Sequence, residues 1–281
     1  MRDDVLVEAE ALAGMLRSER PPVVLDVRWS LGGGDGRELH ASGHVPGAVY
    51  VDMDTELAGP ASAGGGRHPL PSIEQLESAA RRWGIRGDSV VVAYDDVGNT
   101  SAARAWWLLR WGGLERVSLL DGGLRAWWDA GFELEAGSVE PSPGDVVLTP
   151  GHMPTLDADA AARLAREGVL LDARAAERYR GEREPIDPVA GHIPGALSAP
   201  VDANLAPDGR FAGDGALRRR YRSLGVDGAI TVGVYCGSGV AAAHHVAALA
   251  VAGFEAALYP GSWSQWCGDP SRPIALGREP G

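Results

Sequence analysis

The sequence predicts an α/β fold that occurs twice along the chain. The prediction rests on short apolar runs rich in Val and Leu, on runs of helical length between them, and on one long internal repeat. The stretch "GIRGDSVVVAYDDVG" (84–98) aligns without a gap with "GVDGAITVGVYCGSG" (225–239). A repeat of this length indicates two domains of one fold, because solenoid repeats have much shorter periods.

Each copy contains apolar runs that are typical of strands covered on both faces. In the first copy these runs are 22–27, 89–95 and 116–121. The runs 100–111 and 240–253 have helical length and composition, and the second ends on a glycine. Alternating strands and helices predict, in each copy, a parallel sheet flanked by helices on both faces. The working site of such a sheet lies beyond the carboxyl ends of its strands.

Two further pairs of matching motifs set the domain organisation. "LDVR" (25–28) matches "LDAR" (171–174), and "GHVPGA" (43–48) matches "GHIPGA" (191–196). We expect a first domain over 1–134, a Pro- and Gly-rich linker over 135–152 and a second domain over 153–281. Features that occur in both copies are interpreted as scaffold. They include the Asp and Arg of the "LDxR" motifs and the His of the "GHxPGA" turns.

Composition narrows the class of protein. A net charge of −12 argues against nucleic acid and anionic membranes as the main partners. We also read no secretory segment and no apolar run near the ~20 residues of a membrane helix, so a cytoplasmic location is expected. Two cysteines suit a reducing compartment and are too few for a cysteine-based zinc site.

Cys236 is the clearest feature that only one copy has, because Asp95 stands at its aligned position. Small residues follow it (Gly237, Ser238, Gly239), at the point where a predicted strand gives way to a predicted helix. Inward-facing amides and a helix N-terminus stabilise negative charge and favour the thiolate, which is the nucleophilic form. The same loop suits a persulfide anion. The alternative is a buried cysteine that acts only as a small apolar residue.

Cysteine-dependent phosphatases also carry their nucleophile in such a loop. They need an arginine six positions later to bind phosphate in a bidentate fork. Ala242 occupies that position here, so the phosphatase interpretation fails.

The loop "CGSGVAA", the duplication, the "GHIPGA" turn and the closing "GSWSQW" together resemble the two-domain rhodanese-like sulfurtransferases. The resemblance covers nearly the whole chain. It implies tandem rhodanese-like α/β domains of which only the second carries the active cysteine. "CGSGV" looks like the 3-mercaptopyruvate branch, since thiosulfate sulfurtransferases typically have basic residues after the cysteine. Ala241 departs from the threonine that this branch usually has.

The resemblance also implies the residues of the site. A serine–histidine–aspartate relay matches Ser238, His68 in "RHPLP" and Asp54 in "VDMD", and neither of these two motifs has a counterpart in the second copy. Arg178 matches the arginine that binds the donor. The second family arginine falls on Asp187, and Arg183 is a candidate replacement. The resemblance further implies that the loop residues contact the donor (Gly237, Gly239, Val240, Ala241).

The expected activity is therefore transfer of a sulfane sulfur through a Cys236 persulfide. The donor is a small anion, with 3-mercaptopyruvate favoured and thiosulfate as the alternative. The acceptor is cyanide, a small thiol or a protein such as thioredoxin. No metal or organic cofactor is implied, because the covalent sulfur is the carried group. A non-catalytic rhodanese module that only binds a partner is the rival from another class, and the intact cysteine loop argues against it.

Overall fold

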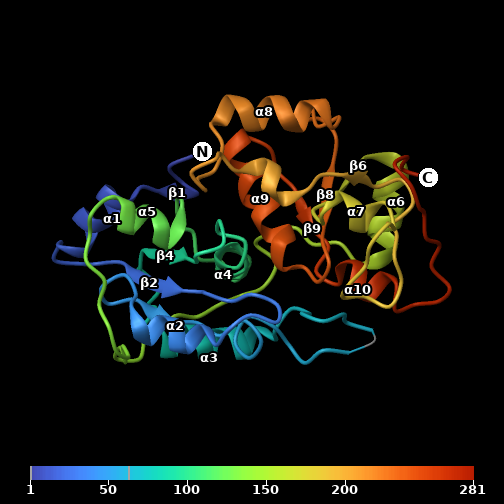
Figure 1. The fold of residues 1–281 in the computed structure, drawn as a ribbon. Helices are drawn as coiled ribbons and strands as arrows, with labels where there is room; N and C mark the ends of the chain where they lie inside the picture. The colour runs from blue at the N-terminus through green and yellow to red at the C-terminus, as the bar shows by residue number, and fades with distance from the viewer. Residues whose placement is uncertain (1, 63) are drawn as a thin grey trace. The chain divides into compact units, whose positions relative to one another are not determined.

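The computed structural model describes residues 2–62 and 64–281, which divide into two compact units. Unit 1 comprises Met1–Gly59, Pro71–His152 and Ala206–Phe211, and unit 2 comprises Pro60–Leu70, Met153–Leu205 and Ala212–Gly281. Each unit is an α/β structure built on one parallel sheet (Figure 1). The predicted fold class is therefore confirmed.

Unit 1 holds a five-stranded sheet in the order β1-β5-β4-β2-β3, and every pairing is parallel. The strands are β1 (Leu6–Val7), β2 (Val23–Asp26), β3 (Val49–Tyr50), β4 (Val91–Tyr94) and β5 (Val117–Leu120). The helices are α1 (Ala9–Leu16), α2 (Gly36–Ser42), α3 (Ile73–Arg82), α4 (Ala102–Trp111) and α5 (Gly123–Asp129). Apolar side chains of α1 and α5 share one core with β2 and β4, while α4 packs against β4 and β5.

Unit 2 holds a four-stranded parallel sheet in the order β7-β6-β8-β9. The strands are β6 (Val169–Asp172), β7 (Leu197–Ser198), β8 (Val232–Tyr235) and β9 (Ala257–Leu258). The helices are α6 (Ala158–Glu167), α7 (Ala176–Tyr179), α8 (Asp214–Ser223), α9 (Val240–Ala252), α10 (Ser262–Trp266) and the 3-10 turn η1 (Val201–Asn204). α6 and α10 share a core with β6 and β8, and α9 packs against β8 and β9.

The central strands β4 and β8 are buried along their whole length, as the uninterrupted apolar runs predict. Full burial of a Val side chain contributes roughly 1.5–3 kcal/mol. β8 ends at Tyr235, so the next residue, Cys236, lies beyond the carboxyl end of a central strand. This is the edge at which parallel sheets place their sites.

The motifs that occur in both copies form matching structures. Arg28 donates to both carboxylate oxygens of Asp26, and Arg174 does the same with Asp172. The ring of His44 bonds the carbonyl of His40 through Nδ1 at 2.8 Å, and the ring of His192 is likewise buried. These contacts hold turns and strand ends, which is the scaffold role that the duplication indicates.

The segment 135–152, expected to be a linker, belongs to unit 1. Glu135 and His44 exchange two backbone hydrogen bonds, and the Gly137 N–H donates to the carbonyl of Ala41 at 2.9 Å. Two segments also lie outside the sequence-based division, since 60–70 belongs to unit 2 and 206–211 to unit 1. The predicted domain limits of 134 and 153 stay a prediction. None of the described helices has the length and apolarity that crossing a bilayer requires.

Candidate active site

Cys236 lies in a loop in which a backbone amide points at its sulfur. The side chain is 3 % exposed, and the Gly239 N–H donates to Sγ at 3.1 Å. α9 begins one residue later, at Val240, so its N-terminal partial positive charge lies at the same place. The Cys236 N–H donates to Ser262 Oγ at 3.1 Å, which fixes the start of the loop. Neither cysteine of the chain is in a disulfide.

The curl of this loop depends on Gly239. Its φ of +82° lies in the left-handed region, which side-chain-bearing residues rarely adopt. A Cβ at this position would also overlap the carbonyl oxygen of Pro260. The glycine therefore lets the backbone turn back so that its own N–H reaches the sulfur.

Ser238 and His68 are brought together within unit 2. His68 Nδ1 lies 2.7 Å from Ser238 Oγ, and the two side chains are 6 % and 7 % exposed. His68 reaches this place because the segment 60–70 folds onto unit 2. Two hydrogen bonds join the segment to α10. Gln265 Nε2 donates to the carbonyl of Gly64 at 2.5 Å, and the Arg67 N–H donates to Ser264 Oγ at 3.1 Å.

Asp54, the predicted third member of the relay, belongs to unit 1. There its carboxylate accepts a hydrogen bond from Trp29 Nε1 at 3.1 Å. Its partnership with His68 stays a prediction.

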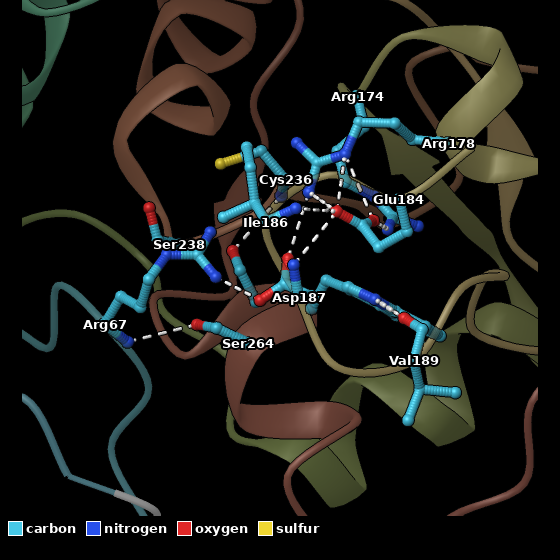
Figure 2. Close-up of polar contacts among 12 residues, drawn as sticks. Arg67, Arg174, Arg178, Glu184, Ile186, Asp187, Val189, Cys236, Ser238 and Ser264 are labelled. Carbon is cyan, nitrogen blue, oxygen red and sulfur yellow. Dashed lines mark hydrogen bonds and ion pairs between the residues drawn. The ribbon is translucent and has the colours of Figure 1, made fainter. Parts of the chain in front are cut away.

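Arg178 lies on the short helix α7 and is held by two acids. Its Nε and Nη2 donate to Glu184 at 2.7–3.1 Å, and Nη2 also donates to Asp187 at 3.0 Å (Figure 2). Burial alone would raise the pKa of Glu184. Hydrogen bonds from Arg178 and from the Asp187 and Ile186 N–H groups lower that pKa below its ordinary value instead.

Arg183 is not part of this cluster. Arg183 is exposed, and its backbone N–H donates a hydrogen bond to the carbonyl of Glu177 at 3.3 Å. The guanidinium that joins Arg178 at Asp187 comes from Arg67, which the sequence did not single out. The available signals were its position beside His68 in "GRHPLP" and the acidic residue at 187.

The remaining predicted loop residues lie close to Cys236 along the chain. Gly237 follows Cys236 directly, while Val240 begins α9 and Ala241 lies in its first turn. Ala242 is completely buried in the same helix, so this part of the loop offers no arginine for a phosphate. Among the described residues, no group of three or more His, Cys, Asp or Glu side chains is arranged to hold a metal ion.

The aligned loop of unit 1 carries a carboxylate where unit 2 has sulfur. Asp95 is fully buried and accepts backbone N–H groups of four residues at 2.7–2.9 Å: Val97, Asn99, Ser101 and Ala102. Burial raises its pKa to about 6, and these four bonds offset part of that effect. The unit 1 loop is thus an amide-lined site filled by its own side chain.

The fold and the loop define a class: a tandem α/β protein with one amide-cradled cysteine at the carboxyl end of a central strand. The Rhodanese-like domain matches residues 8–130 and 157–269. The chain belongs to the rhodanese-like family.

Proteins similar to this chain are named after two different sulfur donors, thiosulfate and 3-mercaptopyruvate. A putative thiosulfate sulfurtransferase of Mycobacterium tuberculosis is 50% identical over 98% of both chains. A probable 3-mercaptopyruvate sulfurtransferase of Pseudomonas aeruginosa is 46% identical over 97% of this chain and 98% of its own. The solved structure of the 3-mercaptopyruvate sulfotransferase SseA from Escherichia coli superimposes with a TM-score of 0.81 at 31% identity, covering 92% of this chain and 98% of that one.

Proposed function

We propose that this protein is a sulfurtransferase that carries sulfur as a Cys236 persulfide. The observation that carries the proposal is the Cys236 loop itself, with the Gly239 N–H on the sulfur and α9 beginning beside it. Amide hydrogen bonds and a helix N-terminus stabilise a negative charge on sulfur before and after it takes up a second sulfur atom. The proposal is supported by family membership and by relatives that are named sulfurtransferases.

With 3-mercaptopyruvate the first half-reaction is a displacement at sulfur. The Cys236 thiolate forms an S–S bond with the donor's sulfur, and the C–S bond breaks with its electron pair moving to carbon as the pyruvate enolate. The donor's thiol proton ends on that carbon, which gives pyruvate. The donor sulfur is oxidised to the sulfane level, and the carbon that it leaves is reduced.

Ser238 and His68 have the geometry to move that proton. The hydroxyl and the imidazole are within hydrogen-bond distance and are shielded from water. A buried imidazole that accepts a proton through a serine follows the logic of serine–histidine relays. We propose that Asp54 completes the relay by fixing the imidazole tautomer.

In the second half-reaction an acceptor takes the outer sulfur. Cyanide attacks it, the S–S bond breaks, and thiocyanate leaves while the electron pair returns to Cys236 as thiolate. A small thiol or thioredoxin fills the same role in a reducing cytoplasm, where we place the protein. Thiosulfate is the second candidate donor, and it releases sulfite.

Arg178 supplies positive charge for the anionic donor. The first choice of donor is 3-mercaptopyruvate, because the loop has Gly237 and Ser238 where a basic pair would suit a dianion.

The test is a steady-state comparison of 3-mercaptopyruvate and thiosulfate with cyanide as acceptor. We expect a higher kcat/KM for 3-mercaptopyruvate. Equal or better use of thiosulfate would overturn the donor assignment. Absence of thiocyanate with both donors would overturn the function, and Cys236-dependent hydrolysis of an aryl phosphate would revive the phosphatase interpretation.

A further inference from the structure

One loop of unit 2 has acidic side chains inside and apolar side chains outside. It spans 182–190, and its ends meet, since a Cβ built on Gly181 would lie 3.5 Å from the Gly191 nitrogen. The side chains of Glu184 and Asp187 are almost fully buried. Surface loops ordinarily show the opposite arrangement, with charged side chains in water. The apolar residues that this loop exposes are Pro185, Ile186, Pro188 and Val189.

The backbone of this loop is held in place from inside. Glu184 Oε1 accepts the N–H groups of Ile186 and Asp187 at 3.1 Å each (Figure 2). Trp263 Nε1 donates to the carbonyl of Val189 at 2.9 Å. The two prolines restrict the backbone further. The exposed apolar side chains are therefore presented by a fixed backbone, and such a surface loses little conformational entropy when a partner binds.

A second segment extends the apolar surface. Leu276 is 66 % exposed, and its Cδ2 would lie 2.4 Å from a Cβ on Gly181 and 3.0 Å from one on Gly191. Its side chain thus lies over the closed base of the loop. Exposed apolar side chains that cluster mark binding surfaces, whereas single ones need no explanation. We call the cluster the apolar rim, which consists of Pro185, Ile186, Pro188, Val189 and Leu276.

The apolar rim lies beside the cysteine loop. Trp263, whose ring holds the carbonyl of Val189, donates its own backbone N–H to the carbonyl of Cys236 at 2.9 Å. Arg178, which the buried acids of the loop hold, has its Nη1 3.6 Å from a Cβ built on Gly237. The two loops are joined at both places, so a partner seated on the apolar rim lies beside Cys236.

Unit 1 has no counterpart of this loop. Between its "LDxR" and "GHxPGA" motifs it has the segment 29–42, which contains three consecutive glycines and no proline. The loop with the outward apolar residues thus occurs only in the copy that has the cysteine. Its presence there ties it to the reaction and not to the scaffold that both copies share.

We propose that the apolar rim is the docking surface for a protein that accepts the sulfur, one whose reactive thiol lies in an uncharged, apolar surface. The proposal rests on the proposed sulfurtransferase function and names the kind of acceptor that its site serves. The chemistry of Cys236 sets the occupant, because the persulfide formed there is consumed by an acceptor nucleophile. The rim exposes no charge, so it offers an acceptor protein an approach that does not depend on opposing the net charge of −12.

The transfer to such a protein balances without a further reactant. The acceptor's thiolate attacks the outer sulfur, and the S–S bond to Cys236 breaks with its electron pair returning to Cys236. The acceptor leaves as a persulfide. In a dithiol acceptor the second thiolate then displaces hydrosulfide, so the two acceptor thiols are oxidised to a disulfide while the sulfane sulfur is reduced to sulfide.

The test compares three acceptors with the better donor at saturation. Reduced thioredoxin is the protein probe, dithiothreitol is a small dithiol of the same chemistry, and cyanide is the reference. We expect Ile186→Ser to lower kcat/KM for thioredoxin about tenfold, as for the loss of one apolar contact in an interface, and to leave the other two acceptors within about twofold. Leu276→Ser, outside the loop, should act in the same way.

Ile230→Ser is the matched control. Ile230 is 40 % exposed against 41 % for Ile186, and it precedes β8, at the edge of the sheet opposite Cys236. We expect it to change none of the three rates. An equal loss with thioredoxin in Ile230→Ser and Ile186→Ser would show a general effect of removing surface apolar groups and overturn the proposal.

Other outcomes separate the alternatives. Equal losses with all three acceptors in Ile186→Ser would mean that the loop supports the nucleophile, and unchanged use of thioredoxin would mean that the rim is not contacted; either overturns the proposal. Self-association that Ile186→Ser abolishes, with thioredoxin use unchanged, would assign the rim to a second copy of the chain. A wild type active with cyanide but not with thioredoxin sinks this inference alone, whereas one that is inactive with all three sinks the proposed function.

Ionic strength distinguishes apolar docking from docking by charge. Glu182 and Arg183 are exposed beside the rim, and contacts made through them would weaken as salt screens them. We expect kcat/KM for thioredoxin, relative to cyanide, not to fall between about 50 and 500 mM sodium chloride. A steep fall that Arg183→Gln removes would assign the docking to charge and contradict the proposal.

Discussion

His68 Nδ1 and Ser238 Oγ lie 2.7 Å apart although 169 residues separate them in the sequence, and both belong to unit 2. The pair depends on the segment 60–70, which comes from the first half of the sequence but packs against α10 in unit 2. In the proposed function this pair moves the thiol proton of 3-mercaptopyruvate, a proton that thiosulfate lacks. The contact therefore links the path of the chain to the choice of donor.

Ser238→Ala is expected to lower kcat/KM for 3-mercaptopyruvate by about 10²-fold, the lower range for loss of general acid–base assistance. Thiosulfate carries no thiol proton, so its kcat/KM should fall much less. Parallel rates with the two donors measure the difference. An equal loss with both donors would mean that Ser238 supports the loop and takes no part in proton transfer.

Asp187→Asn is expected to shift donor preference toward thiosulfate. The side chains of Arg67, Arg178, Glu184 and Asp187 have formal charges that sum to zero, and the substitution leaves one positive charge. An added positive charge favours a dianion over a monoanion. The ratio of kcat/KM for thiosulfate to that for 3-mercaptopyruvate should rise several-fold, by roughly the effect of one partly screened charge. A ratio that is unchanged or falls would contradict the charge argument.

Gly239→Ala is expected to destabilise the protein by about 1–3 kcal/mol, because it combines a left-handed backbone with an overlap on the Pro260 carbonyl. Gly209→Ala is the matched control. Its φ of +83° is nearly the same, but no other atom lies within 4 Å of the added Cβ. Urea unfolding should show a clearly larger loss at 239. Similar losses at both positions would show that only the backbone conformation matters.

The buried carboxylate of Asp95 should make stability depend on pH. Its pKa is about 6 in the folded state against an ordinary value of 3.8, so the folded protein binds this proton more tightly than the unfolded chain. The contribution of Asp95 to the free energy of unfolding therefore falls as pH rises from about 4 to 6, by on the order of 2 kcal/mol, and is then level.

The difference in unfolding free energy between wild type and Asp95→Asn isolates this effect from the other acids. Asparagine keeps the size of the side chain but does not titrate. We expect the difference to change across that pH window and to be constant above it. A difference that is flat from pH 4 to 7 would show that Asp95 is ionised throughout.

The repeat in the sequence predicted much of the scaffold. The matching ion pairs of Asp26 with Arg28 and of Asp172 with Arg174 follow from aligned "LDxR" motifs, because equal local sequence on equal strands gives equal contacts. Cys236 could be predicted as the candidate nucleophile for the opposite reason, since it interrupts the repeat.

Arg67 could not be predicted in the same way. It lies 111 residues before Arg178, and nothing in "GGGRHPLP" indicates that this stretch packs on the second unit. Only the tertiary structure places its guanidinium on Asp187. The sequence offers Arg183 as the nearby replacement for the missing charge, and in the structure Arg183 is an exposed residue.

The most direct test of sulfur transfer is the intact mass of the protein after incubation with 3-mercaptopyruvate and removal of excess donor. Sulfur transfer through Cys236 predicts a species heavier by one sulfur atom, located on Cys236 by peptide mapping and lost on addition of cyanide. Cys236→Ser should show no such species. A wild-type protein that stays at its original mass, or gains the sulfur on Cys267 instead, would contradict the account.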